Sequence, residues 1–114
     1  MQSLHAVIEL ESFLKRARAI MSDDERIGIV MFLATNPEAG ISLGGGLRKV
    51  RVARKGGGKS GGYRTLYVFG GSTMPLFLMT VFAKNEKDNL TKAEQHALQR
   101  LVRTLLATRR PSHG

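Results

Sequence analysis

Residues 75–83 read PLFLMTVFA and are apolar at nearly every position. A strand with one face in water alternates apolar and polar side chains, and this run does not alternate. The run is therefore predicted to be a central strand, covered on both faces of its sheet. The rest of the chain has to supply the layers that cover it.

Three further runs are predicted to be strands. Residues 4–10 alternate weakly between apolar and polar side chains. Residues 47–54 and 63–69 flank a loop rich in glycine and lysine, and a turn at residues 70–73 leads into 75–83. Short links make the last three strands an antiparallel meander, and the first strand is expected at the edge beside the apolar strand.

Two helices are predicted between the first and second strands. Residues 11–21 carry one apolar face, and Ser22-Asp-Asp-Glu25 fits a capping box that starts a second helix at about Asp23. Asn36-Pro37 ends this helix, because proline disfavours helical geometry in the residue before it. The two helices are expected to form an αα-hairpin. The buried stripe of the second helix is expected to contain Ile27, Val30, Met31 and Ala34.

Residues 38–46 are predicted to be a loop, and a second capping box at Thr91-Lys-Ala-Glu94 starts the last helix. The predicted order is β-α-α-β-β-β-α. This is an α+β sandwich in which a small, mainly antiparallel sheet packs with two N-terminal helices and a C-terminal helix. The apolar residues of the last helix recur at the spacing of one helical face; they are Leu98, Leu101, Val102, Leu105 and Leu106.

The chain of 114 residues is long enough for one domain, expected over residues 1–114 with a frayed polar tail at 109–114. It contains no cysteine, which excludes disulfides and thiolate metal sites. The N-terminus has neither the basic flank nor the apolar stretch of a signal peptide. No apolar run is long enough to suggest a membrane span. A cytoplasmic protein without a membrane partner is expected.

The net charge is +9, from 18 basic and 9 acidic residues. This excess on a small domain points to a nucleic acid or an acidic protein as partner. Much of it lies in residues 47–69, where the cations have no acidic residue between them. Like charges repel, so such a run is tolerated only where it is solvated or faces a polyanion. The cations of this stretch are Arg48, Lys49, Arg51, Arg54, Lys55, Lys59 and Arg64.

The loop between these strands contains GGGKS at residues 56–60, which invites comparison with a phosphate-binding loop. That motif needs glycine where Ala53 stands and a helix directly afterwards, but a strand follows here. Nucleotide binding is therefore disfavoured. A solvated hairpin loop and a basic loop that tracks a nucleic-acid backbone both remain, and the net charge favours the second.

Strand periodicity places Lys49 and Arg51 on one face and Val50 and Val52 on the other. The positive face is either functional or a charged edge that prevents aggregation. In the strand at residues 63–69, Arg64 lies on the same face as apolar residues. It is therefore expected at the end of the core, in a cleft or paired with another group.

Lys84 follows the apolar strand at its C-terminal end, which in a meander lies near the start of residues 63–69. Lys84 could therefore sit beside Arg64 and the Lys49/Arg51 strand. The alternative is an ordinary polar loop that leads into the last helix.

The sequence contains no motif that indicates a metal site or a catalytic nucleophile. His5, His96 and His113 are far from the basic stretch, and no pair has metal-ligand spacing. The chain has no GxSxG motif, no paired carboxylates and no cysteine nucleophile. No metal and no cofactor are expected, and hydrolytic chemistry would have to use lysine and arginine.

Three stretches in the same order carry a resemblance to a known family. They are Asn36-Pro37-Glu38-Ala39-Gly40, the sequence GGLRKVRVARKGGGKSGGYRTLYVF at 45–69, and FLMTVFAKNEKDNLTKAE at 77–94. Together they cover over half of the chain. They resemble the RelE/ParE superfamily of bacterial toxins, in particular the HigB-like RelE branch of type II toxin–antitoxin systems. The element order predicted above is similar to the RelE-like fold.

The resemblance implies a ribosome-dependent mRNA endonuclease, or mRNA interferase, that cuts the codon in the ribosomal A site. The ribose 2′-hydroxyl attacks the adjacent phosphate and leaves a 2′,3′-cyclic phosphate and a free 5′-hydroxyl, without a metal. Such cleavage needs a base, charge stabilisation around the transition state, and a proton for the leaving oxygen.

The resemblance also implies roles for individual residues. Arg64 matches the family's strand arginine, whose planar fork can bridge two phosphate oxygens. Either Lys49 or Lys84 could supply a neutral amine as base. The implied catalytic set is Lys49, Arg51, Arg64 and Lys84. The implied RNA-binding set is Arg48, Arg54, Lys55, Lys59 and Asn85.

The sequence departs from the family pattern at two positions. Asn85 stands where RelE has arginine, so one transition-state cation is missing or replaced by Lys84. Thr91 falls where RelE has a tyrosine, and Thr91 is better explained as a helix cap. Tyr63 and Tyr67 could stack on RNA bases or belong to the core.

A toxin has to be restrained, so the resemblance implies an antitoxin, in this branch a helix-turn-helix DNA-binding protein encoded beside the toxin. The other implied partners are the ribosome and mRNA. Two functions compete with the nuclease: a non-catalytic RNA- or ribosome-binding module, and a ParE-like gyrase inhibitor that cuts no RNA. A binding module would tolerate single substitutions, because phosphate contacts add in small increments, whereas a catalyst would not.

Overall fold

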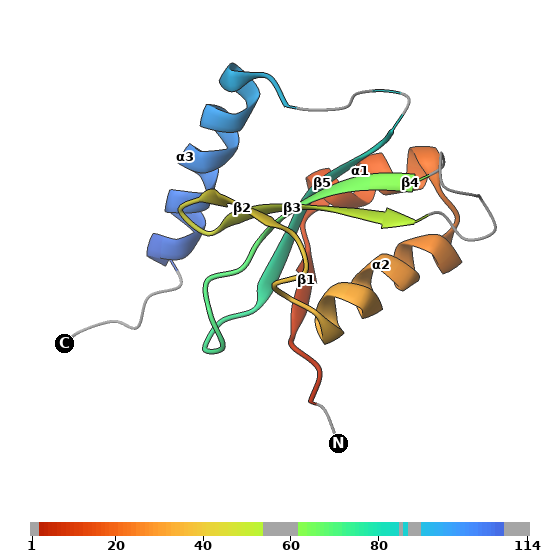
Figure 1. Cartoon of the computed structure of the whole chain (residues 1–114), viewed down its shortest axis with the longest axis horizontal. Coiled ribbons are helices and arrows are strands. Elements are labelled where there is room, and N and C mark those ends of the chain that lie inside the picture. Colours follow the sequence, from red (N-terminus) through yellow and green to blue (C-terminus); the bar gives the residue numbers. More distant parts are fainter. Residues whose placement is uncertain (1–2, 54–61, 85, 87–89, 109–114) are drawn as a thin grey trace.

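The computed structural model describes residues 3–53, 62–84, 86 and 90–108 of the chain. Figure 1 shows a sheet with helices on both sides. The elements in chain order are β1 (Val7–Glu9), α1 (Glu11–Ile20), α2 (Asp23–Thr35), β2 (Ile41–Gly44), β3 (Leu47–Ala53), β4 (Gly62–Val68), β5 (Leu76–Ala83) and α3 (Lys92–Thr108).

The strands form one mixed sheet in the order β1-β5-β4-β3-β2. β3, β4 and β5 are an antiparallel meander, and β1 lies parallel beside β5, as predicted. β1 is shorter than the expected residues 4–10 and pairs with β5 only from Val7 to Glu9. β5 itself begins at Leu76, directly after Pro75, which has no amide hydrogen for a ladder.

The loop expected at residues 38–46 is wrong in part, because it contains strand β2. β2 pairs antiparallel with β3, from Ile41 opposite Lys49 to Gly44 opposite Leu47, with an irregularity after Ser42. Gly44, Gly45 and Gly46 have φ values of +95°, +66° and +96° and form the turn between the strands. Three consecutive left-handed residues suit glycine alone, so this glycine run is a hairpin turn.

Helices cover both faces of the sheet, as Figure 1 shows for α1 and α2 on one side and α3 on the other. Phe13 and Ala17 of α1 and Ile29 and Leu33 of α2 are buried in one apolar cluster. Val102 of α3 is buried in the other. β5 contributes side chains to both clusters, which confirms the prediction of a strand covered on both faces.

Both predicted capping boxes are present. The Ser22 hydroxyl accepts from the Glu25 amide at 3.2 Å, and the Glu25 carboxylate accepts from the Ser22 amide at 3.0 Å. Thr91 and Glu94 repeat this exchange at 3.1 and 2.9 Å. The starts of α2 and α3 are therefore determined by local sequence.

The buried stripe predicted for α2 is wrong in part. Ile27 and Met31 are 48% and 46% exposed, whereas Ile29 and Leu33 are buried against the sheet. α2 is apolar on both sides, so helical periodicity alone does not determine which side faces inward. In α3, Leu101 is likewise exposed rather than buried.

Candidate functional site

The alternation predicted for β3 is confirmed. Val50 belongs to the apolar cluster under α1 and α2, and Val52 packs against it. Leu47 belongs to the cluster under α3. Because side chains alternate along a strand, Lys49 and Arg51 share the face of Leu47, which is the α3 side of the sheet.

Arg64 of β4 lies directly beside these cations. It is paired in register with Arg51 on β3 and with Phe82 on β5. Arg64 alternates with the same parity as Leu66 and Val68, which are buried under α3. The side chain is half-buried, so it lies where the apolar core under α3 meets the basic surface.

Three of the four predicted catalytic cations line one cavity of about 380 Å³. Lys49, Arg51 and Arg64 supply its cations, and the chain at Ala39, Gly40 and Ile41 also lines it. Cations that share a concave surface raise the local concentration of anions more than the same charges on a flat surface. The arrangement is therefore suited to hold a phosphate group.

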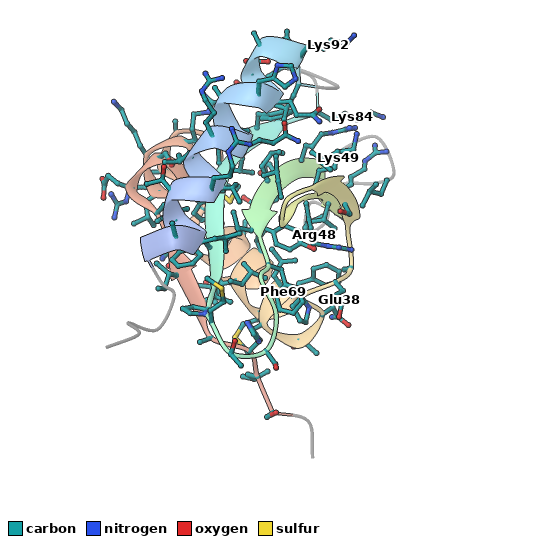
Figure 2. All side chains as sticks on the ribbon, turned by 90° about the vertical axis from the view of Figure 1, so that its left-hand side faces the viewer. Glu38, Arg48, Lys49, Phe69, Lys84 and Lys92 are labelled. Carbon is teal, nitrogen blue, oxygen red and sulfur yellow. The ribbon has the colours of Figure 1, made fainter. Side chains whose placement is uncertain are left out.

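Lys84 lies at the same end of the sheet but is not among the described residues that line this cavity. It follows the last pair between β4 and β5, and its amide donates to the Gly62 carbonyl at 3.2 Å. Strand alternation gives Lys84 the face of Phe82, two residues before it. Figure 2 shows Lys49 and Lys84 at the end of the sheet near the start of α3, where Lys92 is labelled.

Gly62 is a site residue that the sequence patterns did not single out. A Cβ at this position would lie 3.2 Å from the Val52 carbonyl oxygen and 3.7 Å from Nε of Arg51. Arg51 therefore extends across the bare backbone of Gly62. The sequence did contain a signal for this residue, because a glycine at the end of a strand often marks a place where another group comes close to the backbone.

Arg48 is not part of this cluster. Its guanidinium donates to the carbonyls of Glu38 and Gly40 at 3.0 and 2.7 Å, and to the Tyr67 hydroxyl at 3.3 Å. Arg48 shares the face of Val50 and so points to the α1–α2 side of the sheet. Figure 2 shows it extending toward the segment of Glu38, away from Lys84. This geometry fixes the start of β2.

Two further sequence hypotheses can be compared with the structure. Of the two alternatives for Tyr63 and Tyr67, a place in the core is confirmed and base stacking is not, since they are only 3% and 0% exposed. The Tyr63 hydroxyl donates to the Glu25 carboxylate at 3.1 Å. Thr91 caps α3, as predicted. The RNA-binding candidates Arg54, Lys55, Lys59 and Asn85 lie outside the described residues, as do the GGGKS loop and the tail at 109–114.

Glu86 sits two residues after Lys84 and is held by α1. Its carboxylate accepts two bonds from Arg16 at 2.9 and 2.8 Å and one from the Ala83 amide at 2.8 Å. The bond from Arg16, followed by that from Ala83, lowers the pKa of Glu86 below its ordinary value. The segment that carries Lys84 is thereby anchored to α1.

No group of three or more histidine, aspartate or glutamate side chains in the described part of the chain is placed to hold a metal ion. Nor is any helix among these residues long and apolar enough to span a membrane. The chemistry that the described site can supply is that of clustered ammonium and guanidinium groups. Both groups bind phosphate oxygens, and an ammonium group can also transfer a proton.

A comparison with protein families identifies a match. The model of the family described as RelE toxin of the RelE / RelB toxin–antitoxin system matches residues 7–112. The match covers all the elements from β1 to α3, including every described residue of the basic site.

Proposed function

Since the chain belongs to the RelE toxin family and is the toxin of a toxin–antitoxin system, we propose that it is an endoribonuclease that cuts mRNA in the ribosomal A site. The observation that carries this proposal is the cavity in which Lys49, Arg51 and Arg64 converge. A phosphodiester that gains negative charge in its transition state is the substrate class that such a cavity would stabilise.

In the proposed reaction the ribose 2′-oxygen bonds to the adjacent phosphorus, and the bond from phosphorus to the next 5′-oxygen breaks. One group takes the proton of the 2′-hydroxyl, and another gives a proton to the leaving 5′-oxygen. The products are a 2′,3′-cyclic phosphate and a 5′-hydroxyl. The step consumes no water and changes no oxidation state.

We assign the non-bridging phosphate oxygens to Arg64 and Arg51, which are neighbours in register. Half-burial of Arg64 favours this role, because a lower effective dielectric strengthens its attraction for the developing charge. Lys49 lines the same cavity and is the better placed candidate for the base. Lys84, at the end of β5, is then the candidate proton donor for the leaving oxygen.

The remaining assignments rest on the family resemblance. Arg54, Lys55, Lys59 and Asn85 are proposed to hold the RNA backbone. Arg48 is left out of this set, because its guanidinium is engaged by Tyr67 and two backbone carbonyls. The proposed setting is the cytoplasm, with the ribosome and mRNA as partners and a helix-turn-helix antitoxin, as in the HigB-like branch.

The proposal is tested by inducing the toxin in cells that carry a reporter mRNA. Primer extension maps new 5′ ends, with and without a start codon that allows translation. We expect cuts inside codons of the translated reporter and none in the untranslated one. Equal cutting of both would contradict ribosome dependence. Intact mRNA with arrested translation would indicate a non-catalytic binding module, and intact mRNA with altered plasmid supercoiling would indicate gyrase inhibition.

A further inference from the structure

Ile41 of β2 is the most exposed large apolar side chain in the described part of the chain, with 65% of its surface open to solvent. Neither apolar cluster of this part includes it. β2 is an edge strand of the sheet, where exposed apolar side chains favour aggregation. Single exposed apolar residues are common, so the neighbours of Ile41 have to show whether its exposure serves a contact.

The neighbours of Ile41 are the cations of the site. Ile41 is paired in register with Lys49 on β3. Directly opposite residues of an antiparallel pair project to the same face, with their Cβ atoms about 4.5–5.5 Å apart. Ile41 therefore stands on the α3 side of the sheet beside Lys49, and both line the cavity that contains Arg51 and Arg64. An exposed apolar side chain thus borders the surface that is suited to hold a phosphate group.

The chain that carries Ile41 is held against β3. The Gly40 amide donates to the Tyr67 hydroxyl at 3.2 Å, and the Gly40 carbonyl accepts from Arg48 at 2.7 Å. A Cβ at Gly40 would overlap the Lys49 carbonyl, so the two chains lie in close contact here. Isoleucine is branched at Cβ and has few rotamers. The position of its side chain relative to Lys49 is therefore well defined.

The proposed reaction brings a nucleobase to this position. Lys49 is the candidate base for the 2′-hydroxyl, which belongs to the nucleotide on the 5′ side of the cut. The nucleobase of that nucleotide is attached to C1′, which is bonded directly to the 2′-carbon. A side chain next to Lys49 is therefore within reach of this nucleobase, and Ile41 is such a side chain. Tyr63 and Tyr67, the aromatic candidates of the sequence, are buried and cannot contact it.

We propose that Ile41 contacts the face of this nucleobase and is a specificity-determining residue. The assignment rests on the proposed function, which supplies the orientation of the RNA. An aliphatic side chain offers no hydrogen bond to distinguish base edges, so its contribution follows the apolar area that a base covers. A purine covers more of the side chain than a pyrimidine does. The protein is therefore expected to prefer a purine on the 5′ side of the cut.

The test compares cleavage of A-site codons that differ only in the nucleotide 5′ to the cut, on purified translating ribosomes. Ile41→Ala removes the contact, and Ile41→Val keeps a branched apolar side chain. Ile27→Ala is the matched control, because Ile27 of α2 is 48% exposed and is not among the described residues that line the cavity. We expect Ile41→Ala to lower the ratio of kcat/KM for purine over pyrimidine about threefold or more. Ile41→Val and the control should keep the wild-type ratio.

An unchanged ratio in Ile41→Ala would overturn the proposal, and so would a wild-type protein without purine preference. Equal slowing on every codon would also overturn it, because that result indicates a disturbed β2 and not a lost base contact. An equal loss of the ratio with Ile27→Ala would show that the effect does not belong to Ile41.

A second measurement separates this proposal from the nuclease assignment. A-site codons built of 2′-deoxynucleotides lack the attacking hydroxyl, so the affinity of the toxin for such ribosomes reports base contact without cleavage. We expect the wild type to bind a purine codon more tightly than a pyrimidine codon, and Ile41→Ala to lose this difference. Equal affinity of the wild type for both codons would overturn the role of Ile41. Wild-type protein that binds with this difference but leaves every ribonucleotide codon intact would contradict only the nuclease assignment.

Discussion

Arg48 and Arg51 stand three positions apart on β3 and face opposite sides of the sheet. Arg48 donates to two backbone carbonyls and to Tyr67, which holds the chain at residues 38–40. Arg51 faces the cavity that it shares with Lys49 and Arg64. Residue type does not separate the two arginines, but their position in the strand alternation does.

Replacing each of these arginines should therefore change a different quantity. Arg48→Ala removes three hydrogen bonds and is expected to lower the free energy of unfolding by about 1–3 kcal/mol, with little effect on cleavage at 25 °C. Arg51→Ala should slow mRNA cleavage at least about tenfold. Urea denaturation and a reporter cleavage assay measure the two effects. Lost cleavage with Arg48→Ala, or wild-type cleavage with Arg51→Ala, would contradict these roles.

Gly62 gives a second prediction for a single residue. Valine at this position places atoms against the Val52 carbonyl and in the path of Arg51. We expect Gly62→Val to slow cleavage about tenfold or more, since small displacements of a catalytic group have large effects on rate. Gly62→Ala should have a smaller effect, because its Cβ alone only touches these atoms. Thermal unfolding of both variants separates lost activity from lost folding.

At the level of elements, replacing a glycine by alanine is expected to have opposite effects on stability in helix α2 and just before strand β2. Gly28→Ala meets nothing within 4 Å and should stabilise the free protein by about 0.5–1 kcal/mol, because alanine favours the helix. A Cβ at Gly40, just before β2, would lie 2.1 Å from the Lys49 carbonyl oxygen, so Gly40→Ala should destabilise the protein. Urea midpoints of the two variants measure this difference. A lower midpoint for Gly28→Ala would contradict the open space at that position.

The contact between α1 and the segment after β5 should depend on pH. Arg16 lowers the pKa of Glu86, so the contribution of Glu86 to stability is full above the ordinary glutamate pKa of about 4.3. It is lost as the pH falls through the lowered pKa of the folded protein. Glu86→Gln should therefore be slightly less stable than wild type at pH 7, and the difference should vanish in acid. Both side chains are more than a third exposed, so the difference should also shrink in high salt.

The sequence predicted those elements whose signals are local. Ser22 and Thr91 with their glutamates identified two helix starts, and the unbroken apolar run identified β5. The orientation of α2 was not predictable in this way, because apolar residues lie on both of its sides and packing with the sheet selects Ile29 and Leu33. β2 was missed because a four-residue strand has too few residues to show alternation.

The functional site was likewise predictable where the signal lies within one strand, and not where it depends on contacts between elements. Alternation correctly placed Lys49 and Arg51 on one face, and the parity of Arg64 predicted a position at the end of the core, in a cleft or in a pair. The same alternation places Arg48 on the opposite face, but its hydrogen bonds with Tyr67 and Gly40 could not be inferred from the sequence pattern. Gly62 was overlooked because its importance comes from the path of Arg51 above it.

Across the whole molecule, the sheet separates two surfaces of different character. The α3 side carries the cavity of Lys49, Arg51 and Arg64. On the other side, α2 begins with three acidic residues and exposes Ile27 and Met31. A polyanion is attracted to the first surface. Arg51 also lines the cavity beside Gly28 of α2, so cavities on the two sides of the sheet share this residue.

The most direct test of the proposed activity is cleavage of a reporter mRNA on purified translating ribosomes by wild type, Arg64→Ala and Arg103→Ala. Arg103 is an exposed arginine of α3 outside the cavity and controls for the lost charge. We predict that wild type and Arg103→Ala cut within the A-site codon and leave a 5′-hydroxyl. Arg64→Ala, with the circular dichroism spectrum of the wild type, should cut at least about 100-fold more slowly. Wild-type cutting by Arg64→Ala, or uncut mRNA with the wild-type protein, would contradict the proposed activity.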